Sequence, residues 1–366
     1  MAGRGSRATV DGVNAGEVAV GVVVVTYESP PELLARCLGS IAESVGANVG
    51  DVIVVDNASS TPPVVPAGAR LLQRSSNDGF AAAVNAGIAA MRAECSLVFL
   101  LNPDAALAPD ALALCTSTLL GANDRTVAVA PKMLLATSSG DGRPTIDAVG
   151  IGVNAKAEAA NRGLGQPDVG QYDQIDEVFG ACFGAALIRR HAFDSSAVGP
   201  VDETLFLYYE DVAWCWAAQL LGYRILSEPS AVVTHVMSAG VVRERPYAFK
   251  FRFTERNLLL CALMFLEPSN AARVVTRRSL GLLRGSLRGN HFPLAGLRAL
   301  AGTIWLMPHA LGVRRRVTRR RIRTDVEIVA YRDDEPIFYD SVRYEVPDRA
   351  AAEAYAQRRL AAKETA

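Results

Sequence analysis

Apolar and polar residues follow one another in two kinds of block along the first 135 residues. Short blocks that are continuously apolar and rich in valine, isoleucine and leucine predict strands buried on both faces. These strands are expected at residues 18–27, 51–60, 70–74, 97–101 and 127–135. Longer blocks with helical spacing separate them, at residues 30–44, 77–93 and 109–120. The alternation predicts a Rossmann-like α/β half, in which helices cover the sheet.

The pattern is less regular from there to residue 248. Residues 136–175 are rich in glycine, aspartate and asparagine, which predicts a hairpin and long loops. Strand and helix return at 177–193, a long apolar helix is expected within 201–225, and a late strand at 230–236. We expect one α/β domain with a mixed sheet over residues 18–248.

From residue 249 the pattern changes to apolar helices that carry arginine. Between Glu267 and Asp325 there are thirteen arginines and no Asp, Glu or Lys. Such a basic surface fits an anionic partner, either nucleic acid or a phospholipid surface. The apolar stretch 299–313 is shorter than the roughly 20 residues of a spanning helix, which favours lying on a membrane over crossing it. Trp305 beside the arginines favours lipid, since no nucleic-acid-binding motif is present.

We therefore expect residues 249–323 to form a helical, arginine-rich segment on a membrane surface. The alternative is a helical domain that packs on the core with a solvated arginine face. Residues 324–366 contain a strand-like stretch, VEIVAYR, and a terminal helix, and the sequence assigns no role to them. Residues 1–17 lack the apolar core of a signal peptide and are expected to be a flexible leader.

Composition narrows the class of protein. The 366 residues are 50% hydrophobic and 21% charged, which excludes a disordered or fibrous chain and allows a large core. The six cysteines form no CxxC pair, which disfavours a zinc ribbon and a disulfide framework. They fit a reducing environment best, so we expect a cytoplasmic protein that attaches peripherally to the inner face of the cell membrane.

Polar side chains follow three of the predicted strands where those strands end. In open α/β sheets, ligands bind outside the carboxyl ends of the strands, because loops and helix N-termini converge there. The residues at these ends, with two at the start of the 77–93 helix, are Thr26, Tyr27, Glu28, Asp56, Asn57, Asn102, Asp104, Asn77 and Gly79. Asn77 or Asp78 is expected to cap that helix. These positions predict a ligand site at one edge of the sheet.

Two common phosphate-binding motifs are absent from the sequence. No GxGxxG follows the first strand, and no GxxxxGK[ST] occurs. A bound phosphate would need to be neutralised in another way, and a carboxylate that holds a divalent cation can do this. Asp104 follows a buried strand in the sequence Asn-Pro-Asp and is a candidate for that role, although Asn-Pro-Asp is also a good turn former.

Seven stretches, taken in their order along the chain, carry a more specific signal than any one of them alone. They read TYESPPELLARCLGSI, VIVVDNASS, NDGFAAAVNAGI, FLLNPDAAL, FGACFGAALIRR, VDETLFLYYEDVAWCW and THV. Together, over about residues 18–260, they resemble the family 2 glycosyltransferases of the GT-A fold, and most closely the bacterial rhamnosyltransferase-like group. The resemblance implies a GT-A sheet flanked by helices and an enzyme that transfers a hexosyl group.

The resemblance also implies roles for particular residues. Those that would line the nucleotide sugar are Thr26, Tyr27, Glu28, Asp56, Asn57, Asn77, Gly79, Asn102 and Asp104. The Asp56 carboxylate would accept a hydrogen bond from N3–H of the base. Asp104 stands where the family places a metal-binding carboxylate and would be a ligand to Mg²⁺ or Mn²⁺. Asp211 in the sequence YYEDV stands at the position of the catalytic base.

Two assignments stay open on the residues themselves. Glu210 and Asp211 are adjacent on a predicted helix and point about 100° apart, so helix periodicity does not choose between them. The resemblance favours Asp211. His235 follows the apolar stretch SAVVTHV and is either a further metal ligand, as the resemblance implies, or a structural histidine.

The implied reaction is an inverting transfer of a sugar, with rhamnose as one candidate, from a dTDP-, UDP- or GDP-sugar to a hydroxyl of a cell-envelope or lipid-linked glycan. Two other classes stay open. A nucleotidyltransferase also uses metal carboxylates, but a basic, glycine-rich loop would be expected where TYESPPE is acidic. A catalytically silent binding protein is the other, because Ala213 and Ala217 stand where related sequences tend to carry a further acid and an arginine.

Overall fold

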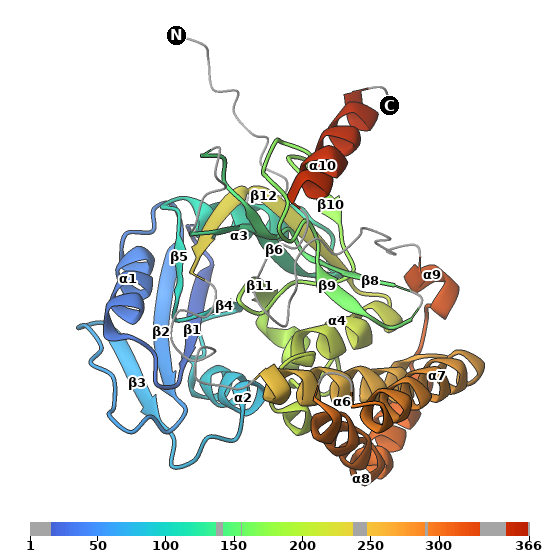
Figure 1. The fold of residues 1–366 in the computed structure, drawn as a ribbon. Coiled ribbons are helices and arrows are strands. Elements are labelled where there is room, and N and C mark those ends of the chain that lie inside the picture. Colours follow the sequence, from blue (N-terminus) through green and yellow to red (C-terminus); the bar gives the residue numbers. More distant parts are fainter. Residues whose placement is uncertain are drawn as a thin grey trace.

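The computed structural model describes residues 16–136, 142–154, 156–236, 247–289, 292–329 and 349–364. The described part is built around a mixed sheet of ten strands with helices packed on both faces (Figure 1). The main strand order is β10-β12-β6-β11-β4-β1-β2-β3, while β5 pairs with β12 and β7 pairs with β6. The predicted fold class, including the helical C-terminal extension, is confirmed.

The N-terminal half of the sheet is parallel. Its strands are β1 (Ala19–Thr26), β2 (Asn48–Asp56), β3 (Ala69–Gln73) and β4 (Leu97–Leu101). Along β1, Val23 and Val25 enter one core cluster, and Val22 and Val24 enter the other. Both faces of β1 are therefore buried, which explains why its sequence has no polar alternation.

Helices cover the two faces in the order that the sequence pattern predicts. They are α1 (Pro31–Ala42), α2 (Phe80–Ala90), α3 (Ala111–Gly121) and α4 (Glu210–Leu220), with 3₁₀ turns at Arg190–Phe193 and Glu203–Leu205. Buried residues of α1 and α3 belong to one core cluster, while those of α2 and α4 belong to the other. The N-cap of α2 is Gly79 rather than the predicted Asn77 or Asp78.

The second half of the sheet turns back on the first. β11 (Ala185–Arg189) lies antiparallel between β4 and β6 (Thr126–Leu135), and β12 (Arg224–His235) runs parallel to β6. The sequence pattern did not predict β5 (Ala105–Leu107), which pairs antiparallel with β12. In that pairing Ala105 lies opposite His235, so the segment that leaves β4 is brought to the end of β12.

Shorter strands complete the predicted hairpin region. They are β7 (Ile146–Ala148), β8 (Ile151–Val153), β9 (Ala159–Asn161) and β10 (Asp176–Glu177). β7 pairs with β6 at the edge of the main sheet, while β8 and β9 form a separate two-stranded sheet.

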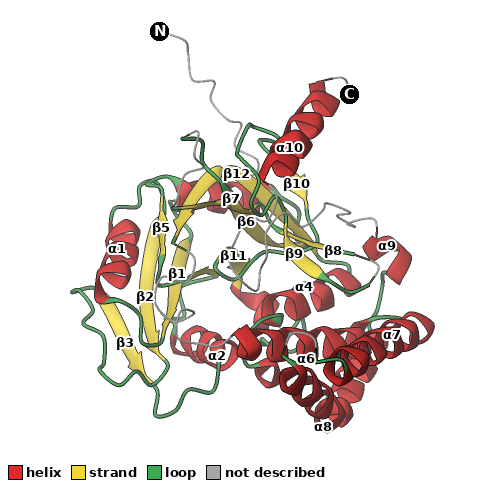
Figure 2. Cartoon of the chain, in the orientation of Figure 1, coloured by secondary structure: helices red, strands yellow, loops and turns green. Residues whose placement is uncertain are grey.

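Three helices gather on one flank of the molecule, next to α4 in the view of Figure 2. They are α6 (Tyr247–Phe265), α7 (Pro268–Leu287) and α8 (Pro293–Thr318). α8 packs against both α6 and α7. The second half of α6 is buried in the same core cluster as α4, and Phe265 stacks on Trp216 with ring centroids 5.9 Å apart. α6 is thus part of the core.

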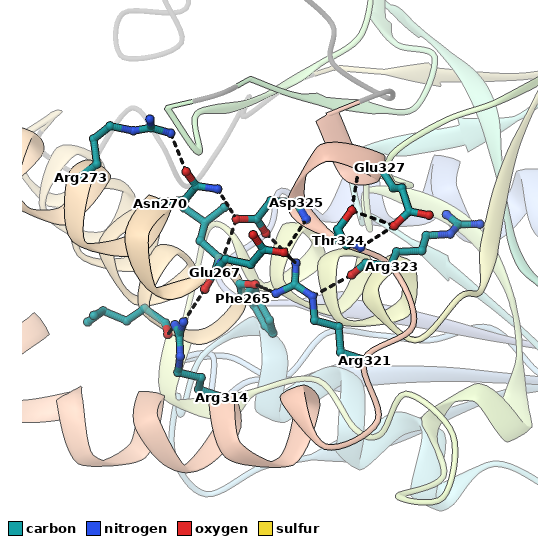
Figure 3. A network of polar contacts seen from close by, with 12 residues as sticks. Phe265, Glu267, Asn270, Arg273, Arg314, Arg321, Arg323, Thr324, Asp325 and Glu327 are labelled. Atoms are coloured by element: carbon teal, nitrogen blue, oxygen red, sulfur yellow. Dashed lines mark hydrogen bonds and ion pairs between the residues drawn. The ribbon is translucent and has the colours of Figure 1, made fainter.

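Several arginines of the basic run bind the molecule itself (Figure 3). Arg321 pairs with Asp325 at 2.7 Å, and Asp325 also accepts from the backbone N–H of Glu267 at 2.8 Å. Arg314 donates to the carbonyl groups of Leu263 and Leu266, both at 2.6 Å. These contacts therefore hold the end of α8 and the segment after it against the junction of α6 and α7.

The structure corrects the prediction that the stretch VEIVAYR is strand-like. Its first four residues lie in α9 (Asp325–Val329), and the remaining residues lie outside the described part of the chain. The backbone N–H of Thr324 donates to Glu327 at 2.7 Å, a contact that closes the first turn of this helix. The predicted terminal helix is present as α10 (Arg349–Glu364).

Candidate functional site

The predicted nucleotide-side residues meet at the ends of β1 and β2. Thr26 pairs with Asp56 across these strands, and the Asp56 side chain is fully buried. Its Oδ1 accepts from the backbone N–H of Ser59 at 3.1 Å, while Oδ2 has no hydrogen-bond partner within the described residues. A buried carboxylate oxygen without a donor is costly. Asp56 therefore presents an acceptor that a ligand N–H could satisfy.

Glu28 links the end of β1 to the loop after β2. Its carboxylate accepts from the N–H of Ser60 at 2.7 Å and from the Ser60 hydroxyl at 3.1 Å. Its own N–H donates to the Ser59 hydroxyl at 2.9 Å. These contacts tie the loop after β2 to the end of β1. Glu28 thus shapes the rim of an open cleft of ≈ 1470 Å³, which Thr26 and Tyr27 also line.

Asn57, Asn77 and Gly79 lie together, as predicted. The Asn57 side-chain amide donates to Asn77 Oδ1 at 2.8 Å and to the Gly79 carbonyl at 3.1 Å. Gly79 has a φ of 96°, and a Cβ there would lie 2.3 Å from the carbonyl oxygen of Phe206. No other residue fits at this position, because the α2 N-terminus is pressed against the loop around Phe206.

The predicted metal ligands Asp104 and His235 are in contact. Asp104 Oδ1 lies 3.1 Å from His235 Nε2, and the Asn102 amide nitrogen lies 3.4 Å from the same ring atom. The other ring nitrogen, Nδ1, lies 2.7 Å from Oδ2 of Asp147 on β7. Asp147 is 1% exposed, so its carboxylate fixes the orientation of the imidazole ring from the buried side.

The electrostatics of this trio fit a cation. Burial lowers the pKa of His235, but the hydrogen bonds and charges of Asp104 and Asp147 outweigh burial and raise the pKa to about 10. A proton on Nε2 therefore occupies the space between His235 and Asp104 at neutral pH. A divalent cation can replace that proton, with Nδ1–H still held by Asp147, an arrangement common among metal-ligating histidines.

The protein donors for a cation are few. In the part of the chain that the structure describes, no three His, Cys, Asp or Glu side chains converge as a metal centre. Asp147 lies on the far side of the His235 ring from Asp104, since each contacts a different ring nitrogen. The residues present fit a cation held by Asp104 and His235 that keeps further positions for a ligand.

Asp211 and the end of β4 both form hydrogen bonds with one backbone segment, which contains Phe183 and Gly184. Asp211 Oδ2 accepts from the N–H of Phe183 at 3.4 Å, and the carbonyl of Gly184 accepts from the N–H of Asn102 at 2.8 Å. Burial raises the pKa of the neighbouring Cys182 thiol, and the carboxylates of Asp211 and Asp147 raise it further. The predicted base and the Asp104 side of the site thus adjoin the same segment.

Geometry now separates the two adjacent acids. Glu210 is 7% exposed, and its Oε2 has no partner within the described residues. Asp211 is partly exposed and accepts from the N–H groups of Val212, at 2.7 Å, and Phe183. Burial raises the pKa of both carboxyl groups, and the charge of Asp211 raises that of Glu210 further, while backbone N–H groups oppose the rise at both residues. Asp211 is therefore the acid that reaches solvent and is held by neighbouring backbone N–H groups.

The loop before α4 is strained. The φ angles of Phe206, Tyr208 and Tyr209 are 64°, 66° and 70°, values that residues other than glycine rarely adopt. Asn257 on α6 is fully buried and donates to the carbonyls of Leu205, Leu207 and Tyr208, the last at 2.6 Å. The strain lies directly before the Glu210–Asp211 pair, where it sets the start of α4.

Arg256 supports the same loop. Its Nη2 donates to the carbonyls of Thr204, at 3.1 Å, and Leu205, at 2.8 Å, and its Nε donates to Asn257 Oδ1 at 2.8 Å. Sequence reasoning missed Arg256, Asn257 and Asp147. The sequence does carry weak signals. Asp147 stands between apolar neighbours in TIDAVG, and Arg256 and Asn257 end a polar run, TERN, that precedes the apolar run LLLCALMF.

Comparison with known proteins now adds to the geometry. Residues 21–195 match the family model described as Glycosyl transferase family 2. No curated protein matches the chain. The chain is similar to GalNAc-T7, solved with UDP, GalNAc and Mn²⁺, with a TM-score of 0.60 and 11% identity. The match covers 91% of this chain and 59% of that one, so the chain spans about three fifths of the length of GalNAc-T7.

Two further solved structures are similar. One is the mannosyltransferase PcManGT from Pyrobaculum calidifontis with GDP-Man and Mn²⁺, at 16% identity and a TM-score of 0.47, covering 86% of this chain and 89% of that chain. The other is residues 1–349 of TarS from S. aureus, at 14% identity and a TM-score of 0.46, covering 82% and 88%.

The family match and the fold point to the same class of protein. Residues 21–195 match the family 2 glycosyltransferase model, and the sheet with its flanking helices is a GT-A fold. The family match supports the glycosyltransferase class that the sequence predicted.

Proposed function

We propose that the chain is an inverting glycosyltransferase that moves a sugar from a nucleoside-diphosphate donor to an acceptor hydroxyl, with Asp211 as the general base. The observation that carries the proposal is that Asp211 and the end of β4 contact the same backbone segment, which contains Phe183 and Gly184. Its Phe183 N–H holds Asp211, and its Gly184 carbonyl holds the end of β4, which leads to Asp104. A base and a phosphate-side carboxylate that adjoin one segment suit a transfer between two bound groups.

The nucleotide would lie across the ends of β1 and β2. Asp56 Oδ2, buried and without a partner in the described part of the chain, is placed to accept from an N–H of the base. Uracil, thymine and guanine each offer such an N–H at a ring nitrogen, so UDP, dTDP and GDP donors are all candidates. Thr26 and Tyr27 line the adjoining cleft.

A divalent cation, Mg²⁺ or Mn²⁺, would be held by Asp104 and His235. When bound, it would supply positive charge that stabilises the departing nucleoside diphosphate. Asp147 would keep Nδ1 of His235 protonated and the ring oriented. Asn102, whose amide lies against the same ring, would complete the contact surface of β4 with the donor.

The chemistry assigned to Asp211 is proton transfer. Its carboxylate takes the proton of the acceptor hydroxyl while the acceptor oxygen forms a bond to the anomeric carbon. The bond between that carbon and the donor phosphate oxygen breaks with its electron pair on the diphosphate. Attack from the side opposite the leaving group inverts the anomeric configuration. A pKa raised by burial suits Asp211, since a stronger base accepts the proton more readily.

The acceptor class is proposed from the helical extension. Helices α7 and α8 expose large apolar side chains, and their sequences contain several arginines and no acidic residue. The exposed apolar residues are Leu280, Leu283, Leu287, Leu294, Leu297, Ile304, Trp305 and Leu311, which we call the apolar stripe. Exposed arginines on these two helices and at the C-cap of α7 include Arg277, Arg284, Arg288, Arg298, Arg315 and Arg316. Apolar and cationic residues together fit the surface of an anionic bilayer.

None of the described helices is long and apolar enough to cross a membrane. We propose that α7 and α8 lie on the inner face of a bacterial cell membrane and bring residues 18–248 to a lipid-linked or cell-envelope glycan. Since α6 is buried in the core, the proposed membrane contact is confined to α7 and α8 within residues 249–323. Rhamnose is the proposed sugar, on the strength of the sequence motifs alone.

Nucleotide binding tests the donor site. Isothermal titration of UDP, dTDP and GDP, each with Mn²⁺ and with EDTA, should show one nucleotide that binds more tightly with Mn²⁺. The substitution Asp104→Asn should abolish the Mn²⁺ effect and leave binding in EDTA unchanged. Failure of all three nucleotides to bind in Mn²⁺ would reject the proposed donor site.

A further inference from the structure

A pocket of ≈ 720 Å³ lies between the strained loop and the helical extension. The loop contributes Thr204 and Phe206, α6 contributes Arg252 and Arg256, and α8 contributes Arg298 and Trp305, among other residues. Phe206 stacks on Phe253, which also lines the pocket, with ring centroids 5.3 Å apart. The pocket thus combines three guanidinium groups with aromatic rings.

The positive charge of the pocket is poorly balanced. Arg252 Nε is buried and has no partner within the described residues. Arg256 is 8% exposed, and burial, then the charge of Arg252, lowers its pKa to about 10, so it remains charged at neutral pH. Among the described residues, Glu203 is the one acid that lines the pocket, and its Oε1 already accepts from Asn85 at 2.9 Å. An anion in the pocket would relieve the repulsion between the guanidinium groups.

The pocket also opens onto the apolar stripe. Trp305 is 83% exposed and belongs to both, and Ile304 beside it is 67% exposed. A molecule that places an anionic group among the arginines can therefore place an apolar chain along α8. Guanidinium groups bind phosphate oxygens well because their N–H donors form a planar fork.

We propose that this pocket binds the phosphate or diphosphate group of a phosphorylated acceptor lipid. The proposal rests on the proposed function and names the class of acceptor. Arg256 carries the link to the site, since the same side chain lines the pocket and holds the carbonyls of Thr204 and Leu205. An occupant would thus press on the loop that leads to Asp211.

Vesicle binding tests the proposal without a donor. Phosphatidylcholine vesicles with and without about 5 to 10 mol% of a prenyl phosphate are floated with the full chain. Wild-type protein should bind the prenyl phosphate vesicles about tenfold or more tightly than neutral ones. The double substitution Arg252→Gln and Arg298→Gln should remove that preference. Arg277→Gln with Arg288→Gln removes the same charge from α7 and its C-cap, outside the pocket, and should keep that preference.

Three outcomes would overturn the proposal. The first is an unchanged preference in the Arg252 and Arg298 variant. The second is an equal loss in both double variants, which would indicate general attraction to anionic lipid. The third is binding of soluble pyrophosphate as tight as that of the prenyl phosphate vesicles, which would indicate a free anion as ligand. Nucleotide titration of each variant tests folding and the donor site independently of vesicle binding. Failure of the donor site would therefore not be mistaken for failure of the pocket.

Discussion

Asp51 and Asp56 lie on the same strand, and both side chains are buried. Asp51 is satisfied within the protein: Arg70 Nε donates to Oδ1 at 3.0 Å and the N–H of Arg92 donates to Oδ2 at 3.0 Å. Burial raises the pKa of Asp51, but the contacts with Arg70 and Arg92 outweigh it, so the pKa is lowered. Asp56 has one oxygen without a donor in the described part of the chain. The same residue type is structural at one end of β2 and open to a ligand at the other.

The substitution Asp56→Asn should weaken nucleotide binding about 10- to 100-fold, because an amide N–H would face the N–H of the base where an acceptor is needed. Asp51→Asn is the matched control on the same strand. It should destabilise the fold by about 1 to 3 kcal/mol through the loss of hydrogen bonds to a charged group and leave nucleotide affinity unchanged. Titration calorimetry and urea unfolding measure the two effects. Equal nucleotide affinity in wild type and Asp56→Asn would contradict the assignment of Asp56.

The pH profile of transfer reports on Asp211. A general base must be ionised, and burial raises the pKa of this carboxyl group above the ordinary aspartate value of about 3.9. The rate constant kcat/KM should therefore fall as pH decreases through a pKa higher than that value. The acid limb should be absent from whatever activity remains in Asp211→Asn. An identical limb in the variant would assign the titration to another group.

At the scale of single residues, the sequence predicted those that lie where strands end. Asp56, Asn57 and Asp104 follow apolar runs and are recognisable for that reason. Asp147 was missed, because its role depends on the pairing of β7 with β6 and on the fold that brings it to His235. A contact between residues 88 apart in sequence leaves no local pattern.

At the scale of elements, α6 joins the helical extension to the α/β half. The Asn257 side-chain amide lies within hydrogen-bond distance of three carbonyls of the loop at residues 205–208, and Arg256 donates to those of Thr204 and Leu205. The loop that they hold also docks on α2, where the Phe80 N–H donates to the Phe206 carbonyl at 2.7 Å. One buried polar pair on α6 thus connects the nucleotide side of the site with the start of α4.

Replacing Asn257 by Ala should lower kcat about tenfold or more, because the loop before Asp211 could relax from its strained conformation. Stability should fall by about 1 to 3 kcal/mol, since buried carbonyl groups lose their donor. Thr254→Ala on the same helix is the control and should change neither quantity strongly. Steady-state kinetics below the unfolding transition separate the two effects. A fall in stability with kcat unchanged would show that Asn257 has a structural role alone.

Element prediction succeeded where hydrophobic periodicity was strong. β1, β4 and α1 lie within two residues of their expected bounds at each end. β5 was missed, because three residues after a turn carry too little pattern, and its strand partner β12 lies more than a hundred residues away. α9 was read as a strand because its β-branched residues outweighed the Thr324 and Glu327 contact that starts the helix.

At the scale of the whole molecule, the arginine-rich extension has two distinct parts. Arginines at its end bind backbone carbonyls and acids of the core, as Arg314, Arg320 and Arg321 do. Others stay exposed beside the apolar stripe on α7 and α8. The first part fits a domain packed on the core, and the second fits a membrane contact. The net charge of zero conceals this separation.

Flotation with phosphatidylglycerol vesicles at low salt tests the membrane contact. Wild-type protein should bind, and the double substitution Leu297→Ser and Ile304→Ser should weaken binding about tenfold or more, since each removes an exposed apolar side chain from α8. Val64→Ser removes a side chain that is 94% exposed outside α7 and α8, and it should have no effect. Loss of binding in neither variant, or in both alike, would reject the apolar stripe as the contact.

Turnover of nucleotide sugars tests the central assignment most directly. Wild-type protein with Mn²⁺ or Mg²⁺ is incubated with UDP-, GDP- and dTDP-sugars and with prenyl phosphate-linked glycan acceptors, and release of nucleoside diphosphate is measured. We predict release from at least one donor that EDTA abolishes. Asp211→Asn should reduce that release by orders of magnitude while binding the same nucleotide with unchanged affinity. Release from Asp211→Asn at the wild-type rate would contradict the role of Asp211 as the base.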